Sequence, residues 1–82
     1  MITRPAKHSL TLHGHRTSVS LEPEFWEAFR AIAAEKSTHI NALAAEIDDA
    51  RSGDAGLASA IRVFVLTHYR AATRSSVTAR SP

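Results

Sequence analysis

One arginine and two serines alternate with other residues in the segment RTSVSL, residues 16–21. Successive side chains of a strand point to opposite faces, so Arg16, Ser18 and Ser20 would share one face. A guanidinium donates hydrogen bonds in a planar fork, and a hydroxyl can donate or accept. Such a face can therefore bind a polar partner. Alternation alone predicts no more than the solvated face of an antiparallel sheet.

The opposite face of this strand carries Thr17, Val19 and Leu21, which we expect to cover a core. Glu22 and Pro23 end the strand and open a helix, because proline has no N–H and its φ suits the first helical turn. A lone strand leaves its backbone groups unpaired, and no later segment has a comparable strand pattern. We therefore expect the same strand of a second copy to pair with it, antiparallel about a two-fold axis.

A second alternating run precedes this strand, at residues 8–13, with Leu10 and Leu12 on one side. Gly14 interrupts the run, as expected of a turn, a bulge or a kink. The run either folds back on residues 16–21 as a hairpin or extends that strand. Of these two alternatives we favour an extension or a loosely attached arm.

Three amphipathic helices are predicted after the strand: one at about residues 23–36, one that follows residues 37–39 and ends at about residue 50, and one at about residues 57–72, each with an apolar stripe of helical spacing. Thr38 is the expected N-cap of the second helix. The stripes and the inner face of the strand give the predicted core and dimer residues: Val19, Leu21, Phe25, Trp26, Phe29, Ile32, Leu43, Ile47, Ile61, Phe64 and Val65.

The third helix is apolar beyond one face, because Val63 and Leu66 widen its stripe. A helix of this kind must be buried on several sides, which indicates a subunit interface or a partner protein's groove. Around this domain, placed at residues 8–72, we expect a flexible basic arm at residues 1–7 and a disordered tail at residues 73–82.

The chain resembles the ribbon-helix-helix (Arc/MetJ-type) superfamily of bacterial DNA-binding proteins. The resemblance rests on GHRTS at residues 14–18, Leu21-Glu22 and Phe25-Trp26, and it covers about residues 8–50. It implies a mainly α fold, a ribbon-helix-helix with an additional C-terminal helix. It also implies a homodimer whose two-stranded antiparallel ribbon takes one strand from each subunit.

The resemblance further implies that the ribbon reads base edges in the major groove. By position the base-contacting residues are Arg16, Ser18 and Ser20, and arginine suits guanine O6 and N7. The start of the second helix and the N-terminal arm would hold phosphates. The phosphate-contacting residues would be Thr38, His39, Asn41, Lys7 and Arg4. His39 stands where serine or threonine is usual and Ser37 where glycine is frequent, which predicts a weaker clamp or a pH-sensitive contact.

Size, charge and composition agree with a small DNA-binding protein. The 82 residues make one small domain that needs oligomerisation for stability, since no cysteine is available for disulfides. Basic residues stand alone in residues 1–21 and 55–82, whereas all acidic residues lie in residues 22–54. This separation indicates that the ends meet an anionic partner. We expect double-stranded DNA as that partner, no membrane, and a cytoplasmic, nucleoid-associated location.

The leading function is thus a dimeric, sequence-specific transcriptional regulator, acting as a repressor and forming dimers or higher oligomers. The alternative is an antitoxin-like interaction module whose C-terminal helix binds a partner protein. An enzyme is not expected, because the chain has no Gly-rich phosphate loop and no nucleophile–base arrangement. We also expect no cofactor and no metal, although His8, His13 and His15 lie close together in the sequence.

Overall fold

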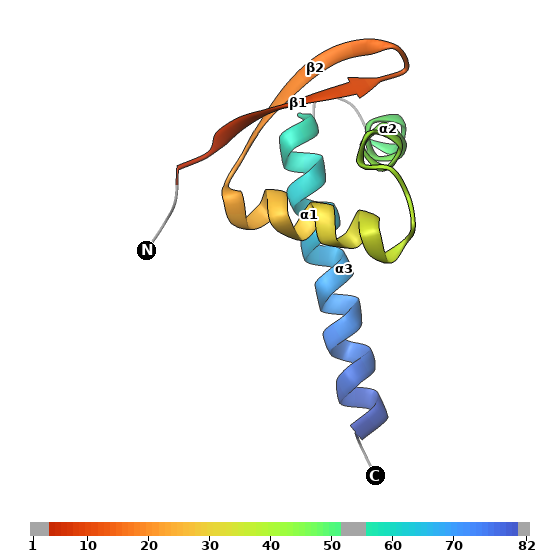
Figure 1. Cartoon of the computed structure of the whole chain (residues 1–82). Coiled ribbons are helices and arrows are strands. Elements are labelled where there is room, and N and C mark those ends of the chain that lie inside the picture. Colours follow the sequence, from red (N-terminus) through yellow and green to blue (C-terminus); the bar gives the residue numbers. More distant parts are fainter. Residues whose placement is uncertain (1–3, 52–55, 81–82) are drawn as a thin grey trace.

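A computed structural model describes the backbone of residues 4–51 and 56–80 and the side chains of residues 4–51 and 56–73. The elements are β1 (Ala6–Leu12), β2 (His15–Leu21), α1 (Pro23–Glu35), α2 (Ile40–Ala50) and α3 (Leu57–Arg80). The predicted ribbon-helix-helix fold with an additional C-terminal helix is confirmed, but both strands of the ribbon belong to one chain. The strands lie together at one end of the molecule and α3 projects from the other (Figure 1). No helix in the described part has the length and apolar character needed to span a membrane.

The strands β1 and β2 form an antiparallel hairpin that runs from Ala6 opposite Leu21 to Leu12 opposite His15. The expectation that residues 8–13 extend the ribbon or form a loose arm is therefore wrong. The expectation that β2 finds no strand partner in its own chain is also wrong. Lys7 belongs to β1 and lies opposite Ser20 instead of in a flexible arm. Of that arm, residues 1–3 lie outside the described residues.

A two-residue turn closes the hairpin. His13 has φ 51° and Gly14 has φ 80°, and positive φ at both central residues is typical of a type I′ turn, whose twist matches the flanking strands. His13 Nε2 also lies 2.9 Å from Asp49 Oδ1 of α2. The turn thus sets the pairing of the strands, and the imidazole attaches the tip of the hairpin to a helix.

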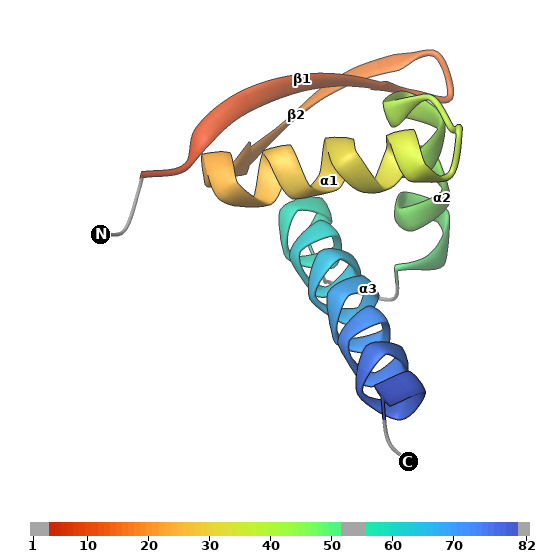
Figure 2. The ribbon, with the colours of Figure 1, turned by 60° about the horizontal axis from the view of Figure 1, so that its bottom comes forward.

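The helices lie beneath the hairpin, and the core fills the space between them (Figure 2). Leu10 and Leu12 of β1 are buried together with Val19 and Leu21 of β2. The other buried core residues come from the helices: Phe29, Ile32, Ala33, Leu43, Ala44, Ile47, Ile61 and Val65. Phe25, Trp26 and Phe64 are partly buried and pack against this core.

Aromatic rings connect the ribbon to the core. The His8 ring of β1 stacks on the Trp26 indole, with centroids 4.0 Å apart and planes 7° from parallel. The ring centroids of Trp26 and Phe29 are 6.3 Å apart, and Phe29 contacts Phe64 edge-on with centroids 6.2 Å apart. One continuous set of contacts therefore runs from β1 through α1 to α3.

The N-cap of α2, at the junction with α1, is not the residue that the sequence predicted. After the C-cap Lys36, Ser37 adopts φ 52°. The Ser37 and Thr38 N–H groups donate to Ala34 O at 3.0 Å and Ala33 O at 2.9 Å, which makes a Schellman motif. Thr38 is not the N-cap of α2. That position belongs to His39, whose side chain accepts from Asn41 N, whereas the Thr38 hydroxyl donates to Lys36 O at 3.1 Å.

Helix α3 ends at Arg80 and not at Ala72. Its last turns occupy residues for which disorder was predicted, and no glycine or proline interrupts residues 57–80. On its surface Val63 and Leu66 are 62% and 54% exposed. The prediction that this helix is buried on several sides is thus not met by the contacts within a single chain.

Two substitutions at positive φ should have opposite effects on stability. Gly14→Ala should destabilise the fold by about 1–2 kcal/mol, because a Cβ disfavours the left-handed region. Ser37→Gly should stabilise it by about 1 kcal/mol, because the same penalty is removed. Urea unfolding followed by circular dichroism measures both changes. Equal unfolding midpoints for the two variants would contradict this account of the turn and the helix end.

Candidate nucleic-acid interface

The hairpin has one polar face, and both strands contribute to it. Three cross-strand pairs make up this polar face: Lys7 opposite Ser20, Ser9 opposite Ser18, and Thr11 opposite Arg16. All six residues are exposed, whereas the leucines and the valine on the other face are buried. The helices therefore cover one side of the sheet and leave hydroxyls, one ammonium and one guanidinium on the other.

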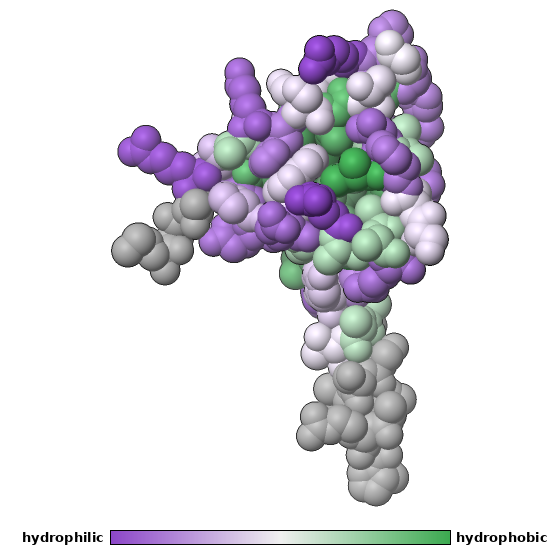
Figure 3. Space-filling view, viewed as in Figure 1, coloured by the Kyte–Doolittle hydropathy of each residue, from purple (hydrophilic) through white to green (hydrophobic). Residues whose placement is uncertain are grey.

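The space-filling view agrees with this division. Hydrophilic residues lie on the outer part of the hairpin, and hydrophobic residues gather between the hairpin and the helices (Figure 3). The structure thus places Arg16, Ser18 and Ser20 on one surface. Sequence reasoning missed Ser9 and Thr11 on this surface and assigned Lys7 to the arm. The alternation of residues 8–13 was the signal that could have found them.

The outer edge of each strand is bonded to a helix near one end. On β1, Thr11 N donates to Asn41 Oδ1 of α2 at 3.1 Å. On β2, Ser20 O accepts from Arg62 Nη2 of α3 at 3.2 Å. Exposed strand edges attract further strands, so these two bonds occupy groups that a third strand would otherwise use.

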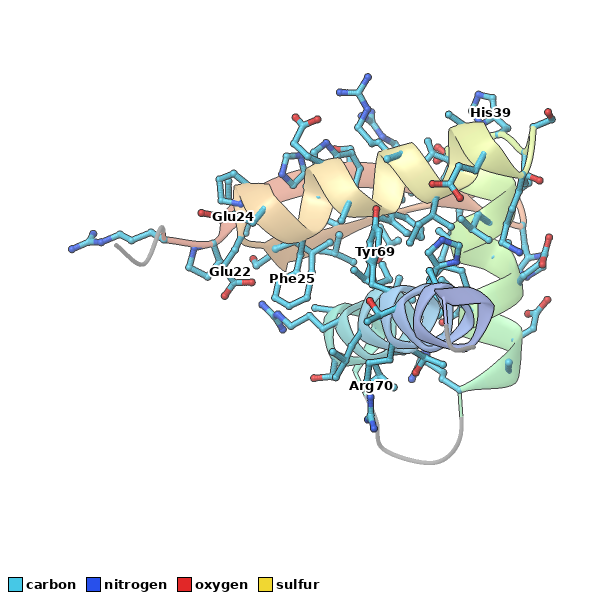
Figure 4. All side chains as sticks on the ribbon, turned by 90° about the horizontal axis from the view of Figure 1, so that it is seen from below. Glu22, Glu24, Phe25, His39, Tyr69 and Arg70 are labelled. Carbon is cyan, nitrogen blue, oxygen red and sulfur yellow. The ribbon has the colours of Figure 1, made fainter. Side chains whose placement is uncertain are left out.

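Arg62 also holds the junction between β2 and α1. Its Nε donates to Glu22 Oε1 at 3.0 Å, and its Nη2 lies 3.0 Å from the same oxygen. The guanidinium carbon lies 5.9 Å from the Phe25 ring centroid, within reach of a cation–π contact. Glu22 and Phe25 lie on the side of α1 that faces α3, whereas Arg70 points away from it (Figure 4). One side chain thus joins the end of the ribbon to two helices.

The Glu22 carboxylate is stabilised by these contacts. Its own backbone N–H lowers the pKa of Glu22 below the ordinary value of 4.5, and the hydrogen bond and charge of Arg62 lower it further. The ionised form is therefore the one that the folded chain favours.

The predicted phosphate contacts divide into two places. His39 lies at the start of α2 (Figure 4), where its Nδ1 accepts from Asn41 N at 3.2 Å. An anion at this helix start would compete with the imidazole for that N–H. The Asn41 side chain is bonded to β1. Arg4 is exposed just before β1, and Lys7 belongs to the polar face of the hairpin.

The three histidines of the N-terminal region lie in different parts of the hairpin and have different neighbours. His8 packs on Trp26, His13 bonds Asp49, and His15 lies opposite Leu12. Within residues 4–51 and 56–73, no group of three or more potential ligands is placed to hold a metal ion.

Comparison with known protein families matches residues 5–69 to the ribbon-helix-helix domain. The chain belongs to the ribbon-helix-helix family. Ribbon-helix-helix members bind DNA and form dimers, and they are generally transcription regulators or antitoxins and typically not enzymes. No curated protein and no solved structure matches the chain.

The lowered pKa of Glu22 predicts a pH-dependent stability. A depressed folded-state pKa stabilises the fold above the unfolded-state pKa, and this contribution is lost as the pH falls through the folded-state value. Glu22→Gln should therefore lower the urea midpoint at pH 7, and the difference from wild type should close as the pH falls and Glu22 becomes protonated in the folded chain. Glu46→Gln, at an exposed position of α2, is the control. A difference that stays constant down to pH 3 would contradict the assignment.

Proposed function

We propose that this chain is a sequence-specific, double-stranded DNA-binding protein that regulates transcription as a repressor. The polar face of the hairpin would enter the major groove, where Arg16, Ser18 and Ser20 contact base edges. The observation that carries the proposal is the exposure of all three side chains on a ribbon whose other face carries the buried leucines and Val19. A protein of this kind would act on the nucleoid, in the cytoplasm.

The dimensions and the chemistry of the ribbon support this proposal. The major groove of B-DNA accepts a two-stranded β-ribbon, and its base edges present distinct patterns of donors and acceptors. Arg16 can donate two hydrogen bonds to guanine O6 and N7, and the serine hydroxyls can adapt to either kind of group. No acidic residue lies on the polar face to repel phosphates.

Phosphate contacts would surround this reading surface. Arg4 precedes β1 and is exposed, and we assign it to the DNA backbone. At the start of α2 we assign the same role to Thr38, His39 and Asn41. A phosphate bound there would take the N–H of Asn41 that His39 now caps. This exchange would make the contact sensitive to the protonation of His39, since a protonated imidazole cannot accept a hydrogen bond.

Arg16→Ala should weaken binding to the preferred site by about 1–3 kcal/mol and relax base preference at one position. Binding-site selection from random DNA, followed by fluorescence anisotropy, measures both effects. Arg30→Ala removes an exposed arginine of α1 and is the matched control. If Arg16→Ala and Arg30→Ala reduce affinity equally for all sequences, Arg16 does not read bases.

We further propose a homodimer that covers the apolar surface of α3. Val63, Leu66 and Tyr69 are exposed there, and Val63 also lines a groove of about 450 Å³ together with Ile47 and Ala50 of α2 and other residues. Exposed apolar surface of this kind marks an interaction site. It equally favours the antitoxin-like alternative, in which a partner protein covers α3.

Light scattering distinguishes these two uses of α3. The homodimer predicts a dimer mass for the purified chain and a monomer mass for Leu66→Glu, because a buried carboxylate is costly at an apolar interface. Glu46→Gln, which changes an exposed residue of α2 outside the lining of the groove, is the control. A folded wild-type monomer would contradict the homodimer and favour the partner-protein alternative.

A further inference from the structure

The two strands of the hairpin are similar in sequence. KHSLTL at residues 7–12 aligns without gaps to RTSVSL at residues 16–21. Each segment has a basic residue first, a serine third, an aliphatic residue fourth, a hydroxyl residue fifth and a leucine sixth. The burial patterns of the two strands agree in the same order, with the aliphatic residue and the leucine buried in both.

The pairing register preserves this similarity. Aligned residues exchange places when the hairpin is rotated by a half turn about the Ser9–Ser18 pair. The pair Lys7–Ser20 then takes the position of Thr11–Arg16, and the reverse. A register shifted by one residue would turn one strand's polar set toward the core. A single chain therefore has a ribbon with approximate two-fold symmetry, which is the symmetry that two identical strands would give.

Each strand is also fixed at the same aligned position. Thr11 and Ser20 are both fifth in their segments, and their backbone groups bond to Asn41 and Arg62 on the outer edges. The strand β1 is further held by the burial of Leu10 and by the stacking of His8 on Trp26. Replacement of β1 by a strand from another copy would break these contacts.

We propose that β1 and β2 of one chain form a complete base-reading ribbon, in which Lys7, Ser9 and Thr11 contact bases as counterparts of Arg16, Ser18 and Ser20. This proposal rests on the proposed DNA-binding function and adds that the second strand of the ribbon is the chain's own. Lys7 and Arg16 lie at opposite ends of the polar face, and both residue types recognise guanine O6 and N7. One ribbon then reads an approximately palindromic sequence.

A disulfide can test whether the ribbon stays within one chain. Thr11 N and Ser20 O bond outside the hairpin, so Ser9–Ser18 belongs to the same non-hydrogen-bonded set of pairs. The Cα atoms of such pairs are about 4.5 Å apart, within the range for a disulfide. The chain has no native cysteine. Oxidised Ser9→Cys/Ser18→Cys should therefore run as a monomer on a non-reducing gel.

DNA binding of this locked variant decides the proposal. Because Ser9 and Ser18 belong to the reading surface, the readout is the base preference that remains: the oxidised form should still bind DNA and should keep its preference at the positions read by Lys7 and Arg16. Loss of binding on oxidation and recovery on reduction would show that β1 must leave the ribbon, and would overturn the proposal. Ser18→Cys alone is the control, because a symmetric ribbon between two chains would oxidise to a covalent dimer about the two-fold axis.

Single substitutions test the reading role of β1. Lys7→Ala should reduce affinity for the selected site about tenfold or more and relax base preference at the position related by symmetry to the one read by Arg16. Arg4→Ala, outside the ribbon, should reduce the affinity for all DNA sequences by the same factor. If Lys7→Ala lowers affinity equally for all sequences while Arg16→Ala lowers it in a base-specific way, this inference is overturned and the proposed function remains intact. Absence of base preference in the wild-type chain would overturn the proposed function itself.

Discussion

The structure depends on the pairing of β2 with β1. A strand must satisfy its backbone N–H and C=O groups, and unpaired groups are costly when they leave water. The type I′ turn at His13 and Gly14 brings β1 onto β2 within the same chain. This pairing determines where every side chain of the ribbon points, because strand side chains alternate. The fold and the candidate interface therefore have one common cause.

Burial and exposure in the ribbon are two results of that register. The aliphatic side chains of both strands contact the helices, so the register is held by the burial of their apolar surface. The two basic residues and four of the hydroxyl residues then lie on the outer face, whereas Thr17 lies on the side of Leu10 and is exposed. A shift by one residue would turn the polar set of one strand, with Lys7 or Arg16, toward the core and expose that strand's aliphatic residues, at a large cost in free energy. The polar face is thus stabilised by the core beneath it.

Helical periodicity was sufficient to predict α1, α2 and the start of α3. The ends and caps of the helices were harder to predict from the sequence, because each depends on a single local contact. His39 caps α2 through Nδ1, a role that its residue type does not indicate, while the Thr38 hydroxyl bonds backward to Lys36. The length of α3 was underestimated because its last turns are polar, although they contain no helix breaker.

The hairpin was the main error of the sequence prediction. Residues 8–13 and 16–21 both alternate, and Gly14 between them is compatible with a turn, a bulge or a kink, so the pattern allows both a hairpin and an extended strand. The extended strand or loose arm was favoured, whereas His13 and Gly14 form the two central residues of a turn. The family resemblance favoured a partner strand from a second chain. The similarity of β1 to β2 was visible in the sequence, yet its meaning depends on the register, which only the structure supplies.

The most direct test of the central claim is an isotope-filtered NOE measurement on an equal mixture of labelled and unlabelled protein. Non-hydrogen-bonded pairs of an antiparallel sheet bring their Cα atoms closest, so Ser9 and Ser18 should give a strong Hα–Hα signal. The account predicts this signal within one chain and none between chains. An interchain signal between Ser18 and its counterpart in the second copy would contradict it.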